Sequence, residues 1–409
     1  MLVFFTFMHT LNLLIDRAVI SAAKDSIIAD LGLTLNQWGW IMAIFTLGYS
    51  LLQTPTGYFT DSKGPRFVLT FIVIFWSCLT TLTGFMKTFW SMLIVRFLFG
   101  AGEAGTFPAL SKVVFKWYPL KERGLVQGIN FSGGRIGAAF ALPFVAYLID
   151  LIGWRYSFVF FGVTGILLAV AWYLFFRDSP EEFKYIGDEE KKYILETRQE
   201  PSKTKTKLPF GVIMKSKSMW LAMGQYVASN FTFYFTISWM YPYLKERFAL
   251  GGVEAGLYSS IPLLCGAAGN WFSGWLVDRM YSPDNMTRSR RIPAIIGFVL
   301  AAIGILLMMV SDTPQIAIIF LSIAIFGADM TLSPSWSFCI DIGKEHAGAV
   351  SGTMNMAGNL GAFVTIIAFP YLLNWTGSHT VFFYVCAALS VFAIIAWSFM
   401  RSDKPILKN

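Results

Sequence analysis

The sequence has 409 residues, of which 56% are hydrophobic and 14% are charged. Soluble domains carry about 25% charged residues, so the composition excludes an ordinary soluble protein and indicates one that spans a lipid bilayer. The net charge of +8 does not indicate a nucleic-acid-binding protein, because most Lys and Arg residues lie in alternate loops between the apolar segments.

Twelve apolar segments are long enough to cross a hydrocarbon core of about 30 Å. They cover residues 2–22, 38–59, 67–86, 90–111, 128–149, 156–176, 219–243, 255–277, 292–310, 315–335, 349–373 and 380–400. The first segment lacks a basic region and a small-residue cleavage site, so we expect a retained helix and not a signal peptide. The fold class predicted is an all-α membrane protein with twelve transmembrane helices in two pseudo-symmetric six-helix bundles.

The basic residues predict the topology of these segments. Every second loop, starting with residues 60–66, is counted together with the C-terminal tail. These loops and the tail contain 24 of the 32 Lys and Arg residues, whereas the other loops contain 5. Because positively charged loops stay in the cytoplasm, both termini are predicted to be cytoplasmic. We expect a multi-pass protein of a bacterial inner membrane.

Six apolar segments precede the longest hydrophilic stretch and six follow it. We predict an N-terminal bundle at 1–176, a cytoplasmic linker at 177–218 with a short amphipathic helix from Asp188, a C-terminal bundle at 219–400 and a cytoplasmic tail at 401–409. The two halves also share a loop pattern: Gly57-Tyr-Phe-Thr-Asp61 follows the second segment, and Gly274-Trp-Leu-Val-Asp278 follows the eighth. An offset of six segments is what duplication of a six-helix unit produces.

Two apolar segments carry buried charges of both signs. Asp16 and Arg17 lie in the first segment, and Arg96 and Glu103 lie in the fourth. A charge at the bilayer centre costs roughly 2.5–3.5 kcal/mol on insertion scales, so such residues usually mark an ion or substrate path. Asp16 and Arg17 point about 100° apart on a helix, so each needs its own partner. Arg96 and Glu103 share a face but lie about 10.5 Å apart along it, too far for a direct ion pair.

The loop and segment motifs together resemble the anion:cation symporter family of the major facilitator superfamily. This family includes bacterial galactonate, glucarate and hexuronate transporters, and animal relatives of sialin and the vesicular glutamate transporters. The matching stretches are Asp16-Arg17, Tyr49-xxx-Gln53-x-Pro55-x-Gly57, the Gly57/Asp61/Gly64/Arg66 loop, Arg96 to Pro108, Lys116-Trp-Tyr-Pro-Leu-Lys-Glu-Arg123, Ser335-Trp-Ser337 and Asn355-Met-Ala-Gly358.

The resemblance implies roles for the charged residues. Arg17, whose planar fork suits a carboxylate, is expected to bind the substrate carboxylate. Asp16 and Glu103 are expected to be the proton-coupling residues, with Arg96 as a modulator of Glu103. From the residues alone, structural ion pairs between packed helices remain the alternative for all four.

Several polar and aromatic residues are candidates for contact with a polyhydroxylated solute. The resemblance supports substrate contact for Tyr49 and Asn355. For Gln53 and Trp336, hydrogen bonding or stacking with the substrate and a packing role both stay open.

Arg135 departs from the family pattern. Galactonate transporters have a substrate-binding Gln at the position that aligns with Gly134, and here an Arg follows that glycine. If Arg135 reaches the cavity it adds a second cation and favours a dianion; otherwise it pairs with an acidic residue of a neighbouring helix. Asp329, deep in the tenth segment, is predicted to act as a coupling modulator. A second proton site, a partner for Arg135 and a helix bend near Pro334 are all open for it.

The repeated loops predict a cytoplasmic gate. Asp61 with Arg66, and Asp278 with Arg279, are expected to be gating residues. Each Asp can meet a helix N-terminus, which favours negative charge, or an Arg while the cytoplasmic side is closed.

The prediction is a secondary active transporter that couples proton entry to symport of an organic anion, most specifically a sugar acid, by alternating access. An anion exchanger, a facilitator for another carboxylate, or a non-transporting solute sensor are the alternatives. We expect no enzymatic activity, no metal and no cofactor besides protons as the coupling ion. The expected partners are a small organic anion and the lipid bilayer, with no nucleic acid, and the expected state is a monomer.

Overall fold

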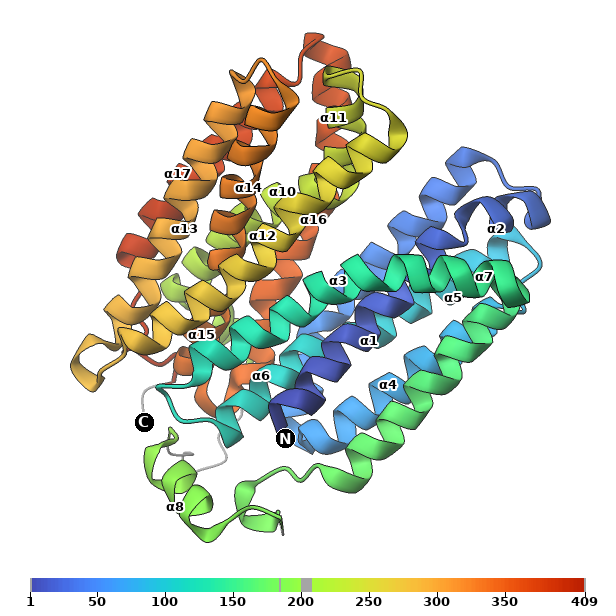
Figure 1. Ribbon diagram of the computed structural model, residues 1–409. Helices are drawn as coiled ribbons and strands as arrows, with labels where there is room; N and C mark the ends of the chain where they lie inside the picture. Colours follow the sequence, from blue (N-terminus) through green and yellow to red (C-terminus); the bar gives the residue numbers. More distant parts are fainter. Residues whose placement is uncertain (1, 184, 200–207, 408–409) are drawn as a thin grey trace. The chain divides into compact units, whose positions relative to one another are not determined.

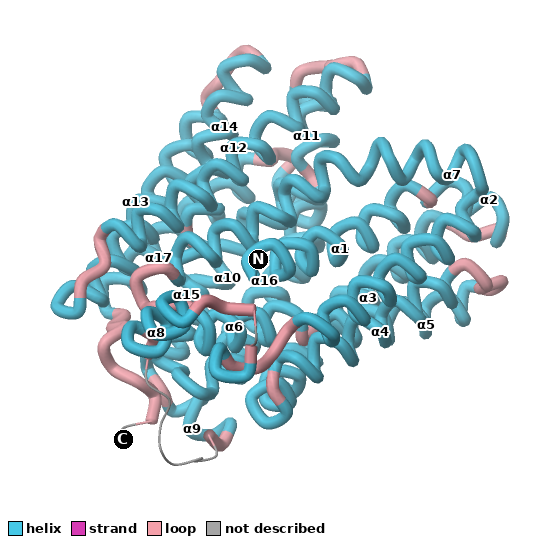
Figure 2. Tube along the Cα trace, turned by 60° about the horizontal axis from the view of Figure 1, so that its bottom comes forward, coloured by secondary structure: helices cyan, strands magenta, loops and turns pink. Residues whose placement is uncertain are grey.

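The computed structural model describes residues 2–183, 185–199 and 208–407, and all regular structure within these ranges is helical. Figures 1 and 2 show long helices joined by mostly short loops. The predicted transmembrane segments all coincide with helices. The prediction of an all-α protein with a helix at each apolar segment is therefore confirmed.

The helices of the first half begin with α1. They are α1 (Leu2–Ala22), α2 (Lys24–Leu31), α3 (Leu35–Lys63), α4 (Pro65–Thr83), α5 (Phe89–Glu103), α6 (Thr106–Trp117) and α7 (Arg123–Phe175). Helix α7 contains the fifth and sixth predicted segments, which meet at Gly153. Gly153 has φ of 78° and ψ of 158°, a conformation that is readily available only to glycine, so the chain turns there between two helical arms.

The helices of the second half follow a hydrophilic stretch that contains α8 (Asp188–Thr197) and α9 (Phe210–Lys215), with α8 at the predicted amphipathic helix. They are α10 (Lys217–Ser238), α11 (Met240–Arg247), α12 (Gly252–Arg279), α13 (Met286–Met309), α14 (Pro314–Met330), α15 (Leu332–Gly343), α16 (Ala347–Thr376) and α17 (Thr380–Phe399).

Three predicted segments are each divided between two helices. The fourth segment changes from α5 to α6 after Glu103, the seventh from α10 to α11 after Ser238, and the tenth from α14 to α15 after Met330. A proline follows each break: Pro108 in α6, Pro242 in α11 and Pro334 in α15. Because a proline has no N–H and its ring clashes with the carbonyl group four residues earlier, Pro108 opposes continuation at Ala104 and Pro334 at Met330.

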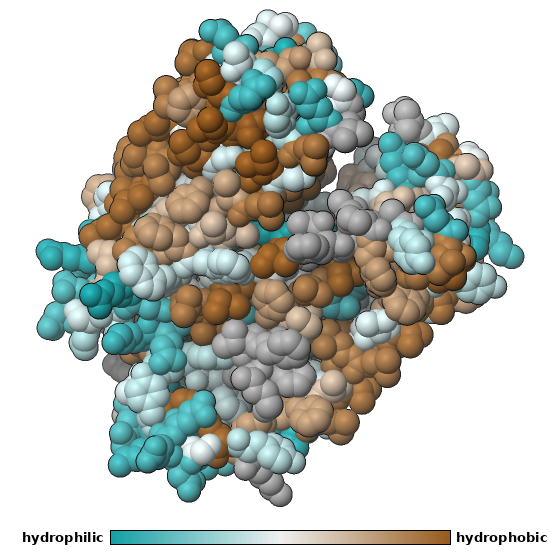
Figure 3. All heavy atoms as spheres, viewed as in Figure 1, coloured by the Kyte–Doolittle hydropathy of each residue, from teal (hydrophilic) through white to brown (hydrophobic). Residues whose placement is uncertain are grey.

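Six helical stretches of the described chain are long and apolar enough to cross a membrane: Pro65–Thr83, Phe89–Trp117, Tyr147–Phe175, Pro283–Met309, Pro314–Ile366 and Thr380–Phe399. Large hydrophobic side chains are exposed along the helices, among them Phe71, Leu167, Ile319 and Ile395. Figure 3 shows hydrophobic side chains over the middle of the helices and hydrophilic side chains towards their ends. This distribution fits a surface in contact with lipid.

The described residues group by their contacts into two compact units. Unit 1 holds residues 1–119, 136–201 and 345–356, and unit 2 holds residues 120–135, 202–344 and 357–409. The start of α7 therefore packs within unit 2, and the start of α16 packs within unit 1. Each of the sites described next is formed by residues of a single unit.

Each unit has its own hydrophobic core. In unit 1 a cluster around Trp76, Phe99 and Trp172 joins α3, α4, α5, α6 and the second arm of α7. In unit 2 a cluster around Phe235, Ile325 and Phe382 joins α10, α14 and α17.

Candidate functional site

An ion pair between α1 and the end of α5 is the central feature of unit 1. The Nε and one terminal nitrogen of Arg17 both lie 2.8 Å from Oε2 of Glu103. The side chain of Glu103 is completely buried, whereas that of Arg17 is 23% exposed. Arg17 is therefore the more accessible partner of the pair.

Aromatic rings surround the two arginines of this site. The guanidinium of Arg17 lies 4.5 Å from the ring centre of Tyr49 and 4.9 Å from that of Phe45. Arg96 is buried, and its guanidinium lies 4.8 Å from the same Phe45 ring and 4.6 Å from Phe99. The negative faces of aromatic rings attract cations. Phe45 thus stabilises both arginines at once.

Asp16 has partners different from those of its neighbour Arg17. Its Oδ2 atom accepts a hydrogen bond from Nε1 of Trp76 at 3.0 Å and one from the amide of Asn12 at 3.4 Å. Its Oδ1 atom is buried and makes no hydrogen bond to the described residues. Asp16 and Glu103 therefore form two separate carboxyl groups in one cluster, with Arg17 and Arg96 as the balancing cations.

Two further predicted residues join this cluster. The hydroxyl of Tyr49 is in hydrogen-bond contact with Arg17 and with Asn355 of α16, and Asn355 is buried. Gln53, one turn from Tyr49 on α3, is buried, and its side-chain amide finds no hydrogen-bond partner among the described residues. The structure thus brings together Asp16, Arg17, Tyr49, Arg96, Glu103 and Asn355, with Gln53 beside them.

Unit 2 contains a second arginine–carboxylate pair. Arg135 of α7 donates from Nε to Oδ2 of Asp329 at 2.8 Å and from a terminal nitrogen to Oδ1 at 2.5 Å. Its guanidinium lies 3.8 Å from the ring centre of Phe233. This two-bond geometry is the strongest arrangement an arginine makes with a carboxylate.

Trp336 of α15 lies in the same unit. It is buried, and its Nε1 donates a hydrogen bond to the hydroxyl of Tyr226 at 2.9 Å. Its ring packs against Phe131 of α7 at 5.4 Å between centres. These contacts fit a packing role, and substrate contact by Trp336 stays a prediction.

Asp61, at the end of α3, lies at the start of α16. Its carboxylate accepts hydrogen bonds from the backbone N–H groups of Gly348 at 3.1 Å and Ala349 at 2.8 Å, and Nζ of Lys112 lies 3.4 Å away. Helices α3 and α16 can touch here because the two residues at their contact, Gly57 and Gly348, are glycines. A Cβ atom on Gly348 would lie 2.7 Å from the carbonyl oxygen of Gly57.

Asp278, at the end of α12, makes the corresponding contact in unit 2. Its carboxylate accepts from the backbone N–H groups of Gly124 at 2.8 Å and Leu125 at 2.6 Å, in the first turn of α7. A Cβ atom on Gly274 would lie 2.6 Å from the carbonyl oxygen of Gly124. Burial raises the pKa of Asp278 to about 7, although the two N–H groups and the charge of Arg290 oppose the shift.

The two arginines predicted beside these aspartates lie elsewhere. Arg66 donates to the carbonyl of Tyr173 at 2.8 and 3.0 Å, and its backbone N–H donates to Asp178. Arg279 is exposed. The sequence allowed either a helix N-terminus or an arginine as the partner of Asp61 and Asp278. In the structure each aspartate binds a helix N-terminus.

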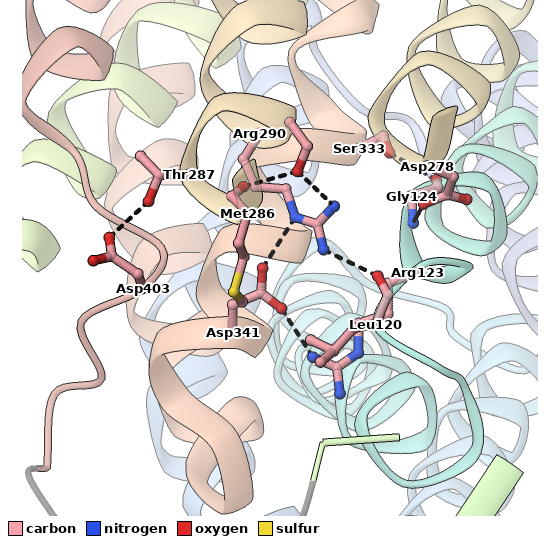
Figure 4. Close-up of polar contacts among 11 residues, drawn as sticks. Leu120, Arg123, Gly124, Asp278, Met286, Thr287, Arg290, Ser333, Asp341 and Asp403 are labelled. Carbon is pink, nitrogen blue, oxygen red and sulfur yellow. Dashed lines mark hydrogen bonds and ion pairs between the residues drawn. The ribbon is translucent and has the colours of Figure 1, made fainter. Parts of the chain in front are cut away.

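A buried charge cluster near Asp278 was not among the predicted sites (Figure 4). Asp341 of α15 pairs with Arg123 at 2.9 Å and with Arg290 at 3.0 Å, and all three side chains are fully buried. Arg290 also donates to the carbonyl of Leu120, and Ser333 donates to the carbonyl of Gly124. The cluster therefore fixes the chain that enters α7 within unit 2.

Some signals for the missed residues were present in the sequence. Asn12 precedes Asp16 by four residues and Phe45 precedes Tyr49 by four, and residues four apart on a helix are neighbours. Trp76 offers no such signal, because it reaches Asp16 from another helix. Arg123 belongs to a quoted motif, but its partner Asp341 is 218 residues away.

Comparison with known proteins identifies a family model and relatives that match this chain. The model of the Major Facilitator Superfamily matches residues 5–366. The chain is 30% identical to a probable sulfoacetate transporter of Cupriavidus necator, over 92% of this chain and 87% of that protein. It is also 30% identical to a probable galactarate/D-glucarate transporter of Escherichia coli K12, over 95% of this chain and 91% of that protein.

A solved structure has the same fold. The proton:xylose symporter XylE, bound to 6-bromo-6-deoxy-D-glucose, aligns with a TM-score of 0.78 at 16% identity, covering 98% of this chain and 96% of that chain. At this identity the likeness concerns the fold alone. It supports the architecture of twelve helices in two six-helix domains.

Proposed function

Because this chain belongs to the Major Facilitator Superfamily, and is therefore a multi-pass membrane transporter and not an enzyme, we propose that it carries an organic anion together with protons. The curated relatives are named as transporters of sulfoacetate and of galactarate and D-glucarate. The substrate class proposed here is accordingly a small carboxylate or sulfonate, and most specifically a sugar acid.

The observation that carries the proposal is the pair of Arg17 and Glu103. An arginine that is 23% exposed is occupied by a carboxylate that is fully buried. A substrate carboxylate has the same charge and shape as the Glu103 side chain, so the two compete for one guanidinium fork. Tyr49 and Asn355, which contact each other beside Arg17, supply hydroxyl and amide groups for a polyhydroxylated solute.

This competition couples the substrate to a proton. If substrate takes Arg17 while Glu103 stays ionised, a buried carboxylate loses its counter-charge, which is strongly unfavourable. A proton on Glu103 removes that penalty, so substrate and proton bind together. Asp16, which has a buried oxygen without a described partner, is the second carboxyl group that can take a proton, and Arg96 adjusts both through its charge.

The membrane potential gives the coupling its use. An anion that enters a cell is opposed by an inside-negative potential at about 2.3 kcal/mol per charge per 100 mV. Two protons carried with a monoanion make the transfer electrogenic in the favourable direction. We place the protein in a bacterial inner membrane with both termini in the cytoplasm, as the distribution of basic loops predicts.

The proposal is tested by thermal stabilisation of the purified protein. The panel contains galactonate, gluconate, galactarate, glucarate, glucuronate and sulfoacetate at pH 5.5 and pH 8, with Arg17→Ala as the variant. A shift of several degrees that the variant loses is expected. If no anion stabilises the protein at either pH, or if Arg17→Ala responds as the wild type does, the assignment of Arg17 as the anion anchor is wrong.

A further inference from the structure

A line of buried polar side chains follows one face of α1 within unit 1. His9, Asn12 and Asp16 are spaced so that each lies about one helical turn from the next. All three are buried, and the amide of Asn12 donates to Oδ2 of Asp16 at 3.4 Å. Two turns of helix, about 10.5 Å, separate His9 from Asp16. The line therefore leads from Asp16 towards the start of α1.

Several atoms along this line have no hydrogen-bond partner among the described residues. They are both ring nitrogens of His9, Oδ1 of Asp16 and Oγ of Ser77 on α4. Ser77 differs in this respect from Thr80 and Thr83 of the same helix, whose hydroxyls donate to the carbonyl groups four residues before them. Buried polar groups in folded proteins nearly always bind a protein group or ordered water. The unpartnered atoms therefore fit a site for ordered water.

A glycine of α7 keeps the space beside these atoms open. A Cβ atom on Gly165 would clash with Oγ of Ser77 and would lie 3.4 Å from the amide nitrogen of Asn12. Ser77 and Asn12 thus meet Gly165 where α1, α4 and α7 come together. The hydroxyl of Ser77 consequently lies beside the polar face of α1, on the stretch between His9 and Asp16.

His9 lies at the end of unit 1 where α1 begins and α7 ends. Its ring packs edge-on against that of Trp172, with 4.7 Å between the ring centres, and Trp172 lies three residues before the end of α7. The distribution of basic loops predicts that this end faces the cytoplasm. His9 therefore stands between Asp16 and the side to which a proton symporter releases its protons.

We propose that His9 is a proton relay, through which Asp16 exchanges its proton with the cytoplasm by way of Ser77 and ordered water. This inference rests on the proposed function, which makes Asp16 a proton-binding group. A neutral imidazole accepts a proton at one ring nitrogen and donates one from the other, so His9 passes a proton onward without carrying a charge at rest. A span of about 10.5 Å needs about four hydrogen bonds of roughly 2.8 Å, and Ser77 supplies a hydroxyl within that span.

The relay affects the rate of proton exchange and not the affinity of Asp16 for its proton. The charged groups that act on Asp16 are Glu103 and Arg96 of α5, and the ring that packs against His9 is the uncharged Trp172. Replacement of His9 by an apolar ring therefore leaves the charges around Asp16 in place. A change in rate at an unchanged titration midpoint is a result that a merely structural histidine would not produce.

The rate at which Asp16 exchanges its proton tests this inference without any substrate. Infrared absorption of the protonated carboxyl groups is recorded over a pH series, and the Asp16 band is the one that Asp16→Asn removes. The band is then followed after a rapid pH jump across its midpoint. We expect His9→Phe to slow the change at least about tenfold with the midpoint unchanged, and Ser77→Ala to slow it severalfold.

The control is Thr80→Val, which removes a hydroxyl from the same helix as Ser77. The hydroxyl of Thr80 donates to the backbone of its own helix at 3.1 Å, so this variant should exchange the proton of Asp16 at the rate of the wild type. If His9→Phe is poorly folded, the comparison of Ser77→Ala with Thr80→Val decides, and equal rates in these two variants would overturn the relay.

The outcomes separate this inference from the proposed function. A wild-type exchange rate in His9→Phe, or an Asp16 band that does not titrate in the wild type, would overturn the relay while leaving the pairing of Arg17 with Glu103 as the basis of anion transport. The proposed function fails on a different measurement, the absence of any stabilisation by the anion panel.

Discussion

Asp61 and Asp278 occupy equivalent positions in the two halves of the chain, and each accepts two backbone hydrogen bonds from the first turn of a helix. Asp61 binds the start of α16, and Asp278 binds the start of α7. A carboxylate at a helix N-terminus is stabilised by unpaired N–H groups and by the helix dipole. Each contact therefore joins the end of one helix to the start of another helix of the same unit, and the two contacts lie at corresponding positions in the two halves of the chain.

The two contacts differ in charge. Nζ of Lys112 lies 3.4 Å from Asp61, whereas none of the described ion pairs includes Asp278. Burial raises the pKa of both carboxyl groups, and Lys112 opposes the shift at Asp61. At Asp278 the pKa reaches about 7. Asp278 is therefore the contact that titrates near neutral pH.

The first prediction concerns pH. The carboxyl group of Asp278 binds a proton more tightly in its contact with α7 than a solvated aspartate does. Protonation therefore favours the closed contact at low pH, and this advantage is lost as the pH rises through about 7. Ser333, which is buried and donates to Gly124, reports opening when it is replaced by cysteine in a background without the four native cysteines. From pH 5.5 to pH 8, its labelling relative to Asp278→Asn should rise on the order of tenfold.

The ratio to Asp278→Asn corrects for the intrinsic pH dependence of thiol labelling, because both proteins carry the same reporter. Asp61→Asn serves as a second reference and should leave the pH response at residue 333 in place. A ratio that stays flat between pH 5.5 and pH 8 would show that Asp278 does not control this contact.

The second prediction concerns the close approach of α7 and α12. In Gly274→Val, the new side chain would meet the backbone of Gly124 and Leu125, with its Cβ 2.6 Å from a carbonyl oxygen, so the helices must separate. Labelling at residue 333 should rise severalfold. Gly256→Val on the same helix is the control, because a Cβ there meets nothing within 4 Å; equal effects of the two substitutions would refute the tight contact.

The third prediction concerns the buried cluster of Arg123, Asp341 and Arg290. Asp341→Asn leaves two fully buried arginines without their carboxylate, and loss of one partner of a buried pair costs about 3–5 kcal/mol. Arg290→Gln leaves one arginine with one aspartate and should cost less. Melting temperatures of the two variants in the same detergent check this order, and a more stable Asp341→Asn protein would contradict it.

The sequence predicted the helices well because apolar length is a strong signal for membrane spans. It did not predict the breaks after Glu103 and Ser238, and for the tenth segment it left a bend near Pro334 only as one alternative. Proline alone is not sufficient evidence for a break, since Pro55 lies inside the continuous helix α3 and Pro262 inside α12. The change of direction at Gly153, in contrast, falls between two predicted segments.

The sequence also identified most of the charged residues at the candidate site but did not fix their partners, since it gave the pairing of Arg135 with Asp329 only as one of several alternatives. Arg17 and Glu103 are 86 residues apart, and Arg135 and Asp329 are 194 apart. Helical periodicity gives the face of a residue within its own helix and not which helix lies opposite. For this reason Arg96 and Glu103 could be judged too distant to pair, whereas the choice of Arg17 as the partner of Glu103 required the structure.

The measurement that tests the central claim most directly is proton and substrate flux in proteoliposomes containing the wild type and Glu103→Gln. A glutamine keeps the shape of Glu103 and cannot release a proton. The account predicts that the variant exchanges labelled for unlabelled substrate across the membrane but no longer moves protons with it or responds to a pH gradient. A Glu103→Gln protein whose uptake is still driven by a pH gradient, with the proton flux of the wild type, would contradict it.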